Sequence, residues 1–331
     1  MADTPSHDDF RPTASWETLQ LRAELLRRLR DFFQQRGFLE VETPLLSADT
    51  VIDRHLDPFC VVLDDGAAGA SPGRRLWLQT SPEFGMKRLL AAGGEAIYQV
   101  TRSFRRGERG PLHNPEFTLV EWYRRGDGMA EGMQLLSDLC EALLARGPAE
   151  RIRYGEAFER HVGLDPHTAG VEELTSKVAA LGIAAPESLA RDDRDGWLDL
   201  LLVERVEPHL GHRRPVIVYD YPAGQAALAR VRPGDPPVAE RFELYVSGIE
   251  LANGYHELLD AAELRARNAR NNALRRADGK PALPEQCRLL AAMEAGLPAA
   301  TGVALGFDRV VMLAAGAKCL DEVIAFPFEQ A

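Results

Sequence analysis

The chain has 331 residues, of which 45% are hydrophobic and 27% are charged, a balance typical of a globular protein of one large or two modest domains. Fifty acidic side chains against 39 basic ones leave a formal net charge of -11, which excludes the general attraction for DNA or long RNA that a basic surface provides. The first residues lack the features of a signal peptide, and the late apolar stretch is interrupted by Asp308 and Arg309, so no membrane segment is expected. Four cysteines without metal-ligand spacing agree with a reducing compartment, and we expect a cytoplasmic protein.

The first third of the chain predicts a tail, a helix and a strand-to-helix junction. Residues 1–14 are expected to form a flexible tail, and apolar residues spaced by three and four from Trp16 to Phe33 predict a helix that Gly37 ends. The stretch "DDGAAGASPG" predicts a surface loop. The segment "RLWLQT" predicts a strand that leads into the helix "SPEFGMKRLLAAGG", where Ser81 can act as the cap.

An arginine-rich loop, "RSFRRGERGPLHNPEF", joins two predicted strands, "AIYQVTRSF" and "EFTLVEWY". Alternation along the second strand places Phe117, Glu121 and Tyr123 on one face, and Arg105 continues the polar face of the first strand. A guanidinium beside an aromatic ring suits a nucleotide, because arginine binds phosphate oxygens and the ring stacks on a base. The alternative is a surface loop whose arginines are simply solvated.

A hairpin is predicted for "ERFELYVSGIELANGYHEL", with its turn at Ser247-Gly248. This turn places Glu250 opposite Tyr245 and Glu243 diagonally beside them, near enough for the two carboxylates to share Mg²⁺ with nucleotide phosphates. The alternative is a pair of exposed strand glutamates.

A glycine-containing segment, "TGVALGFDRVVML", follows near the C-terminus. Gly302 and Gly306 permit a close backbone approach, and Arg309 stands at the start of an apolar helix. A tight turn beneath a core helix would explain the glycines equally well. Further helices are predicted over 127–145, 195–209, 257–277 and 283–294, and the stretch 148–212 is the least informative.

In this order the segments resemble the signature motifs of class II aminoacyl-tRNA synthetases. The first helix up to Pro44 resembles motif 1, Arg105 to Phe117 resembles motif 2, and "GVALGFDR" resembles motif 3. The segments "TSPEFGMKRLL", "HNPEFTLVEWY" and "ELANGYHEL" are similar in sequence to segments of lysyl-tRNA synthetase. The short region before motif 1 is similar to that of the truncated bacterial paralogues that ligate (R)-β-lysine to elongation factor P. The resemblance implies an α+β fold, an antiparallel β-sheet flanked by helices, in one catalytic domain over residues 15–331 without an anticodon-binding domain. It also implies a homodimer through motif 1.

The resemblance further implies a role for each matching residue. Arg105 and Arg309 would be catalytic, with Arg105 on the α-phosphate of ATP, His113 and Arg309 on the β- and γ-phosphates, and Phe117 with Arg309 around adenine. The implied ATP-binding set is Arg105, Glu108, His113, Asn114, Phe117, Glu243, Glu250, Gly302, Gly306 and Arg309, with Glu243 and Glu250 holding Mg²⁺. The implied amino-acid set is Ser81, Glu83, Glu121, Tyr123, Asn253, Glu257 and Ala304. Without the resemblance, Glu83 could merely favour a helix N-terminus, Tyr123 could be a core residue, and Glu257 a solvated helix residue.

Two departures from the family pattern stand out. Motif 2 usually has a glutamate two places after its arginine, where this chain has Gly107, followed by Glu108. Motif 3 usually has glycine where this chain has Ala304, which points to a changed amino-acid preference.

The implied activity is ATP-dependent formation of an aminoacyl-adenylate from (R)-β-lysine, followed by amide formation with a lysine of elongation factor P. The alternatives are a non-catalytic binding paralogue and a truncated enzyme that charges tRNA, although the net charge of -11 makes us expect no tRNA charging.

Overall fold

The computed structural model describes residues 10–63 and 73–331. The expected tail and the loop at 64–73 therefore lie largely outside the described residues. The chain divides into two compact units. The first unit is built from the chain up to Arg125, from 259–298 and from 304–331, and the second unit from 126–258 and 299–303.

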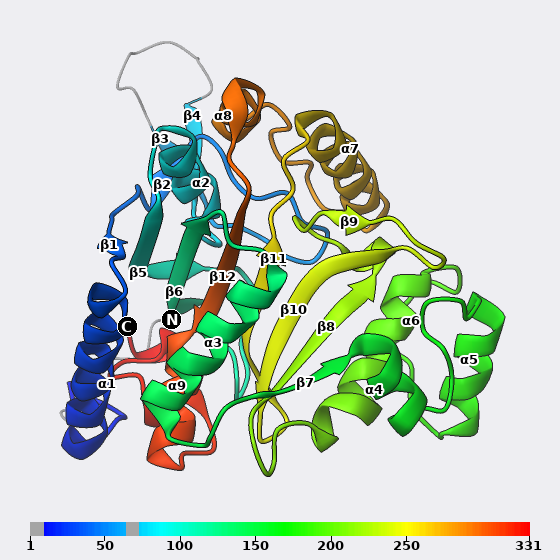
Figure 1. Cartoon of the computed structure of the whole chain (residues 1–331), viewed down its shortest axis with the longest axis horizontal. Coiled ribbons are helices and arrows are strands. Elements are labelled where there is room, and N and C mark those ends of the chain that lie inside the picture. The colour runs from blue at the N-terminus through cyan, green and yellow to red at the C-terminus, as the bar shows by residue number, and fades with distance from the viewer. Residues whose placement is uncertain (1–9, 64–72) are drawn as a thin grey trace, which may run out of the picture. The chain divides into compact units, whose positions relative to one another are not determined.

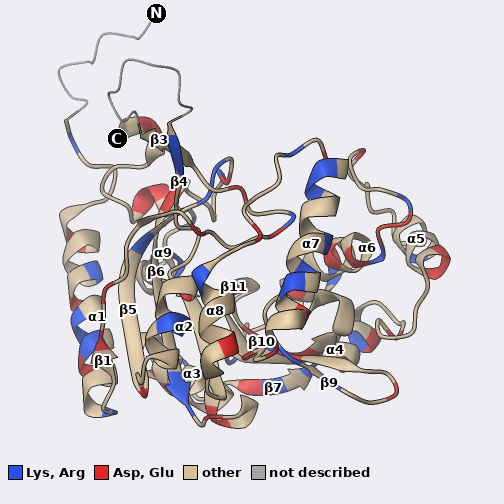
Figure 2. Ribbon diagram, turned by 90° about the horizontal axis from the view of Figure 1, so that it is seen from above, with Lys and Arg blue, Asp and Glu red and all other residues tan. Residues whose placement is uncertain are grey.

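The first unit opens with the predicted helix, α1 (Trp16–Gln35). The Ser15 hydroxyl caps it by accepting the backbone N–H of Thr18 at 3.2 Å, and Gly37 follows its end with a φ of +76°. The Phe33 ring stacks on Tyr98 with 4.4 Å between ring centroids. The outward surface of α1 carries charges of both signs (Figure 2). Trp16, predicted to belong to the apolar face, is instead 72% exposed, because it stands at the first turn, before the buried part of the helix begins.

The strands β1 to β6 that follow α1 in this unit belong to two sheets, and Figure 1 shows β5 beside β6. The strand β5 (Ala96–Phe104) pairs in parallel with β1 (Leu39–Glu40) and antiparallel with β6 (Glu116–Arg125). Gln99 faces Glu121 and Ser103 faces Phe117, so the predicted alternation is confirmed. A small separate sheet has the order β2 (Leu46–Ser47), β4 (Arg74–Leu78) and β3 (Cys60–Leu63).

Helices cover these strands. The helix α2 (Glu83–Ala91) packs against β6 and α8 (Arg288–Gly296), and α9 (Phe307–Ala315) packs against β6 and α1. The helix α7 (Ala261–Ala277) starts later than expected, because the Asp260 side chain caps it by accepting the N–H groups of Ala262 and Glu263. Two short 3₁₀ turns, η4 (Leu320–Glu322) and η5 (Phe328–Gln330), end the chain.

The second unit holds its strands in the order β11 (Ile249–His256), β10 (Val238–Val246), β8 (Val216–Pro222) and β7 (Glu150–Arg153). The turn at Ser247-Gly248 has φ values of +54° and +77°, which confirms the predicted hairpin. The sheet was expected to be antiparallel, but β7 pairs in parallel with β8, as β1 does with β5. These parallel pairs arise because a long crossover connection lies between the paired strands and returns the chain in the same direction. The strand β9 (Val231–Arg232) pairs with β10, and α3 (Met129–Leu144) packs on β10 and β11.

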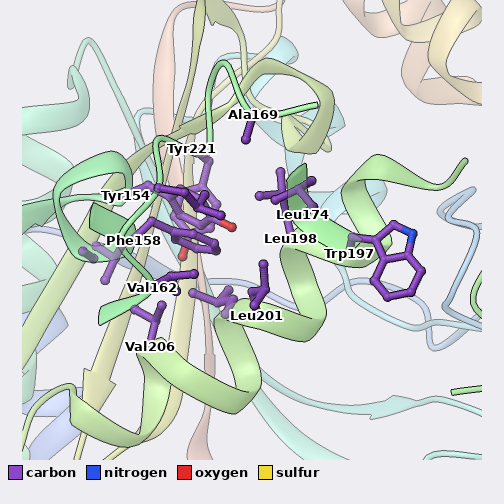
Figure 3. Close-up of a cluster of buried hydrophobic side chains, with 14 of the residues drawn as sticks. Tyr154, Phe158, Val162, Ala169, Leu174, Trp197, Leu198, Leu201, Val206 and Tyr221 are labelled. Atoms are coloured by element: carbon purple, nitrogen blue, oxygen red, sulfur yellow. The ribbon is translucent and has the colours of Figure 1, made fainter. Parts of the chain in front are cut away.

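The stretch 148–212 proves to be an ordered helical part of the second unit. Its helices are α4 (Tyr154–His161), α5 (Val171–Ala180) and α6 (Arg194–Leu201), followed by η1 (Leu202–Val206) and η2 (Glu207–His209), with η3 (Ala223–Gln225) after β8. They enclose a buried hydrophobic cluster in which Tyr154 lies against Phe158 and Tyr221, with 4.6 Å between ring centroids in both pairs (Figure 3). The strand β12 (Ala300–Gly306) contains the point at which the chain leaves the second unit for the first.

No helix in the part of the chain that the structure describes is both long and apolar enough to cross a membrane. All four cysteines are free thiols, and Cys60 is exposed while Cys140 is buried.

Candidate active site

The loop between β5 and β6 holds Arg105 over the ring of Phe117, with 4.9 Å from the guanidinium carbon to the ring centroid. The Arg105 Nε also donates to the carbonyl oxygen of Thr80 at 3.4 Å. Gly107 turns the loop with a φ of +85°, a conformation that favours glycine, and Glu108 then lies with its Oε2 3.7 Å from Arg105 Nη1. The glutamate that follows Gly107 therefore still reaches the motif 2 arginine, in spite of its displacement by one position.

Not all arginines of this loop behave in the same way. Arg109 pairs with Asp321 at 2.8 Å and with Glu329 at 2.7 Å, and Arg102 lies 3.6 Å from Glu116. Carboxylates of the C-terminal segment therefore neutralise Arg109. Arg105 is the loop arginine that lies over Phe117.

Arg309, at the start of α9, contacts His113, the other side chain that the family resemblance assigns to the β- and γ-phosphates. Its Nη2 lies 2.9 Å from His113 Nε2, and its Nε donates to the carbonyl oxygen of Leu112 at 3.2 Å. Loss of water around the ring, followed by the charge of Arg309, lowers the pKa of His113. A neutral His113 accepts the Arg309 hydrogen bond, so the two side chains orient each other beside the Arg105 loop.

The Asn114 side chain forms hydrogen bonds with the protein backbone. Its Nδ2 donates to the carbonyl oxygen of Glu116 at 2.6 Å, and its Oδ1 accepts the backbone N–H of Phe328 at 3.1 Å. The side-chain amide thus fixes the start of β6 and the C-terminal segment, and its contact with ATP stays a prediction. Gly306 is the residue before α9, and Gly302 and Ala304 lie within β12.

Four of the residues predicted to bind the amino-acid substrate lie together in the first unit. They are Ser81, Glu83, Glu121 and Tyr123, and together with Lys87 we call them the carboxylate cluster. The Ser81 hydroxyl donates to Glu121 Oε2 at 2.6 Å and accepts the backbone N–H of Glu83 at 3.0 Å, while Pro82 rather than Ser81 occupies the cap position of α2. The Tyr123 hydroxyl donates to Glu121 Oε1 at 2.5 Å. Both oxygens of Glu121 therefore have a donor.

Lys87 was not predicted as a site residue. Its ammonium forms an ion pair with Glu83, one turn earlier on α2, and both side chains are buried. The spacing of four residues was visible in the sequence, but the same spacing is common on solvated helices. Burial, followed by the charge of Glu83, raises the pKa of Glu121 to about 7, whereas Ser81, Tyr123 and Lys87 act to lower it.

The second unit holds the other predicted carboxylates on the β10–β11 hairpin. Tyr245 faces Glu250 and Glu243 faces Asn253, with a bulge between Leu244 and Tyr245, which confirms the predicted register. Glu243 is buried, and its Oε2 accepts hydrogen bonds from the hydroxyls of Tyr221 and Tyr245, both at 2.5 Å.

Arg241 forms an ion pair with the other oxygen of Glu243. Most of the acceptor capacity of Glu243 is therefore already used, whereas Glu250 is a partly buried carboxylate on the same face. Among the residues that the structure describes, no three His, Cys, Asp or Glu side chains are grouped to hold a metal by themselves. This donor set fits Mg²⁺ that binds through one or two carboxylates together with nucleotide phosphates.

Two further residues predicted to bind the amino-acid substrate, Asn253 and Glu257, are also in the second unit. Oδ1 of Asn253 is buried and makes no hydrogen bond in the structure. Glu257 is 1% exposed, and its backbone N–H donates to the carbonyl oxygen of Ala300 at 3.0 Å, so it is not a solvated helix residue.

Comparison with known proteins agrees with this geometry. The family model "tRNA synthetases class II (D, K and N)" matches residues 5–330. The chain belongs to the class II tRNA synthetase family. The protein named elongation factor P (R)-β-lysine ligase from Vibrio vulnificus is 49% identical over 97% of this chain and 98% of its own. A ligase of the same name from Klebsiella pneumoniae is 48% identical over 97% of this chain and 98% of its own. The one from Vibrio cholerae is 48% identical over 98% of this chain and 100% of its own.

In this class II synthetase, a buried ion pair that the sequence did not predict ties the three motifs together. Arg22 of α1 lies 2.7 Å from Asp308 of α9, and its Nη2 donates to the Thr118 hydroxyl at 2.6 Å. The backbone N–H of Thr118 in turn donates to Asp308 Oδ2 at 2.7 Å. Asp308 stands directly before Arg309, so this network fixes the start of the helix that presents Arg309.

Proposed function

We propose that this protein uses ATP to activate (R)-β-lysine and transfers the resulting β-lysyl group to a lysine side chain of elongation factor P. The observation that carries the proposal is the identity of 48–49% with three ligases of that name over nearly the whole chain. The enzyme is an ATP-dependent ligase of the class II synthetase family.

Several residues of the first unit are proposed to bind the nucleotide. Arg105 and Arg309 would bind phosphate oxygens through forked hydrogen bonds, and neutral His113 would orient Arg309. Phe117 would contact the adenine ring, and Glu108, whose Oε2 lies 3.7 Å from Arg105 Nη1, would release the guanidinium to the α-phosphate.

The two steps of the reaction need little covalent help from the protein. In the first step the substrate carboxylate oxygen attacks the α-phosphorus, the bond to the bridging oxygen breaks, and pyrophosphate leaves. Arg105 and Arg309 stabilise the charge that develops on the phosphate oxygens. In the second step the acceptor amine attacks the acyl carbon of the adenylate, AMP leaves, and an amide is formed. Mg²⁺, when bound by Glu250 and in part by Glu243, supplies charge neutralisation for the phosphates.

Glu83 and Glu121 would meet an ammonium group of the substrate in the first unit. Asn253, whose Oδ1 is buried and makes no hydrogen bond in the structure, is proposed to accept from the substrate as well, and Glu257 is proposed as a further ligand. A buried acceptor without a partner costs free energy, and a bound ligand would offset that cost.

The acceptor is proposed to be a protein rather than tRNA, and the enzyme to act in the cytoplasm as a homodimer. The net charge of -11 gives no general attraction for RNA. Two large apolar side chains near the start of α1, Phe10 and Trp16, are each 72% exposed, and such residues favour a protein interface at motif 1.

Intact mass spectrometry of elongation factor P, incubated with this protein, ATP and each lysine isomer, tests the proposal. The expected result is a mass gain of one lysyl group, larger with (R)-β-lysine than with α-lysine. Charging of lysine tRNA without modification of elongation factor P would support a truncated synthetase. Absence of ATP–pyrophosphate exchange with every amino acid would support the non-catalytic paralogue.

A further inference from the structure

We infer that Lys87 is a positioning residue that limits the carboxylate cluster to a single substrate ammonium group, by neutralising one of its two carboxylates from within the protein. The inference rests on the proposed function, because it assigns a charge-balancing role inside the amino-acid site of that reaction.

The geometry requires Lys87 to belong to the cluster rather than to the surface. Its side chain is 3% exposed and that of Glu83 is 9% exposed, and the two are in direct contact. The Lys87 ammonium also lies 5.9 Å from the centroid of the Tyr123 ring, whose hydroxyl holds Glu121. A buried ammonium is costly unless it is paired, so the pair with Glu83 is part of the folded state and not a fluctuating surface contact.

The charges around Glu121 can be counted from the elements packed against it. The helix α2 contributes Glu83 and Lys87, the strand β6 contributes Tyr123, and the neighbouring strand β5 places the uncharged Gln99 opposite. On the other face of β6, the carboxylate of Asp308 is paired with Arg22. With both glutamates ionised, the cluster contains two negative charges and one positive charge. One further ammonium group therefore balances it.

This count has a chemical consequence for substrate binding. Both α-lysine and β-lysine carry two ammonium groups, and they share the one at the end of the side chain. A cluster that takes one ammonium group leaves the second ammonium group of either isomer to other residues of the amino-acid site. Removal of Lys87 would leave two adjacent buried carboxylates, of which Glu121 would keep its proton to higher pH.

The pH dependence of substrate affinity distinguishes this role from a merely structural one. In the wild-type protein, KM for lysine should fall as pH rises through about 7, because burial raises the pKa of Glu121 to about 7 and the ionised form binds ammonium. In Lys87→Met the fall in KM should move to higher pH by about one unit, so that KM at pH 7 rises about fivefold and recovers by pH 9. The kcat at saturating lysine should change less than KM.

The experiment measures ATP–pyrophosphate exchange from pH 6 to 9 in the wild type, Lys87→Met, Lys87→Gln and Lys87→Arg. Arg88→Met is the matched control, because Arg88 is the next residue on α2 and is exposed. Lys87→Arg and Arg88→Met should keep the wild-type profile. If the pH at which KM for lysine falls is the same in Lys87→Met or Lys87→Gln as in the wild type, the inference is overturned, even if kcat changes.

A calorimetric measurement on the wild type covers the case in which neither neutral variant folds. Lysine binding at pH 7, measured in two buffers of different ionisation enthalpy, should release a fraction of a proton that vanishes at pH 9, because Glu121 is partly protonated only near its pKa. Equal proton release at both pH values contradicts the inference. A wild type with no exchange for any lysine isomer would instead reject the proposed function itself.

Discussion

Replacement of Arg22 by Met tests whether the buried network between α1, β6 and α9 holds the first unit together. Arg22 is 15% exposed, and its partner Asp308 is 3% exposed. The substitution keeps an unbranched side chain of similar length but removes the guanidinium. Asp308 would then keep its hydrogen bond from the Thr118 backbone and lose its ion pair with Arg22.

The expected loss in the free energy of unfolding is about 3 to 5 kcal/mol, because one partner of a buried ion pair is left unpaired. Loss of the hydrogen bond from Arg22 to the Thr118 hydroxyl, worth about 1 kcal/mol, is included in that range. Arg27→Met is the matched control on the same helix, since Arg27 is 62% exposed and pairs with Glu24 and Asp31 at the surface. Surface pairs are worth roughly 0 to 1 kcal/mol, so the control should lose no more than that.

Urea unfolding followed by circular dichroism measures both variants. With a slope of about 3 kcal/mol per molar, Arg22→Met should lower the midpoint by roughly 1 to 2 M and Arg27→Met by much less. Adding Asp308→Asn to Arg22→Met should recover part of the loss, because it removes the unpaired carboxylate. Equal losses in Arg22→Met and Arg27→Met, or no recovery in the double variant, would refute the reasoning.

Single substitutions in and near the proposed site should separate its functions. Arg309→Glu should abolish ATP–pyrophosphate exchange without lowering the unfolding midpoint, since a phosphate ligand becomes a repulsive charge, and near-normal exchange would reject the ATP assignment. Glu250→Gln should raise the Mg²⁺ concentration needed for half-maximal exchange more than it raises KM for lysine; an unchanged magnesium dependence would place the metal elsewhere. Ala304→Gly should move the ratio of the two kcat/KM values toward α-lysine by roughly 1 to 3 kcal/mol, and an unchanged ratio would leave Ala304 without a role in specificity. In the second unit, burial raises the pKa of Asp199 to about 7, so the folded protein binds this proton more tightly than the unfolded chain and stability should fall as pH rises from about 4 to about 7. Thermal unfolding at pH 5 and pH 8 should show a smaller difference in Asp199→Asn than in the wild type, and an equal difference would contradict the assigned cause.

Local patterns in the sequence determined the strands and turns that carry the site. The alternation along β5 and β6 placed Arg105 near Phe117, and the register confirms it. The turn at Ser247-Gly248 placed Tyr245 opposite Glu250. Both predictions succeeded because side-chain alternation and two-residue turns depend on backbone geometry over a few neighbouring residues.

The helix predicted over 195–209 is confirmed as α6, η1 and η2, but the other helices of the second unit between 148 and 212 could not be predicted in this way. Residues 148–212 contain short helices whose apolar residues become a core only when they pack against β8 and each other. The parallel pairing of β7 with β8 was missed for the same reason, since the direction of an edge strand depends on the path of the helices that connect it.

The charge state of the site was decided by tertiary structure alone. In the sequence, Lys87 and Arg22 have the spacing of ordinary solvated helix residues, and Arg241 stands in a strand without an evident partner. Folding buries Lys87 against Glu83, Arg22 against Asp308 and Arg241 against Glu243. Whether a charge needs a partner depends on how much water it loses, and that loss is set by the packing of segments far apart in the chain. The sequence therefore determined which side chains could perform the chemistry, and only the tertiary structure decided which of them are neutralised from within the protein.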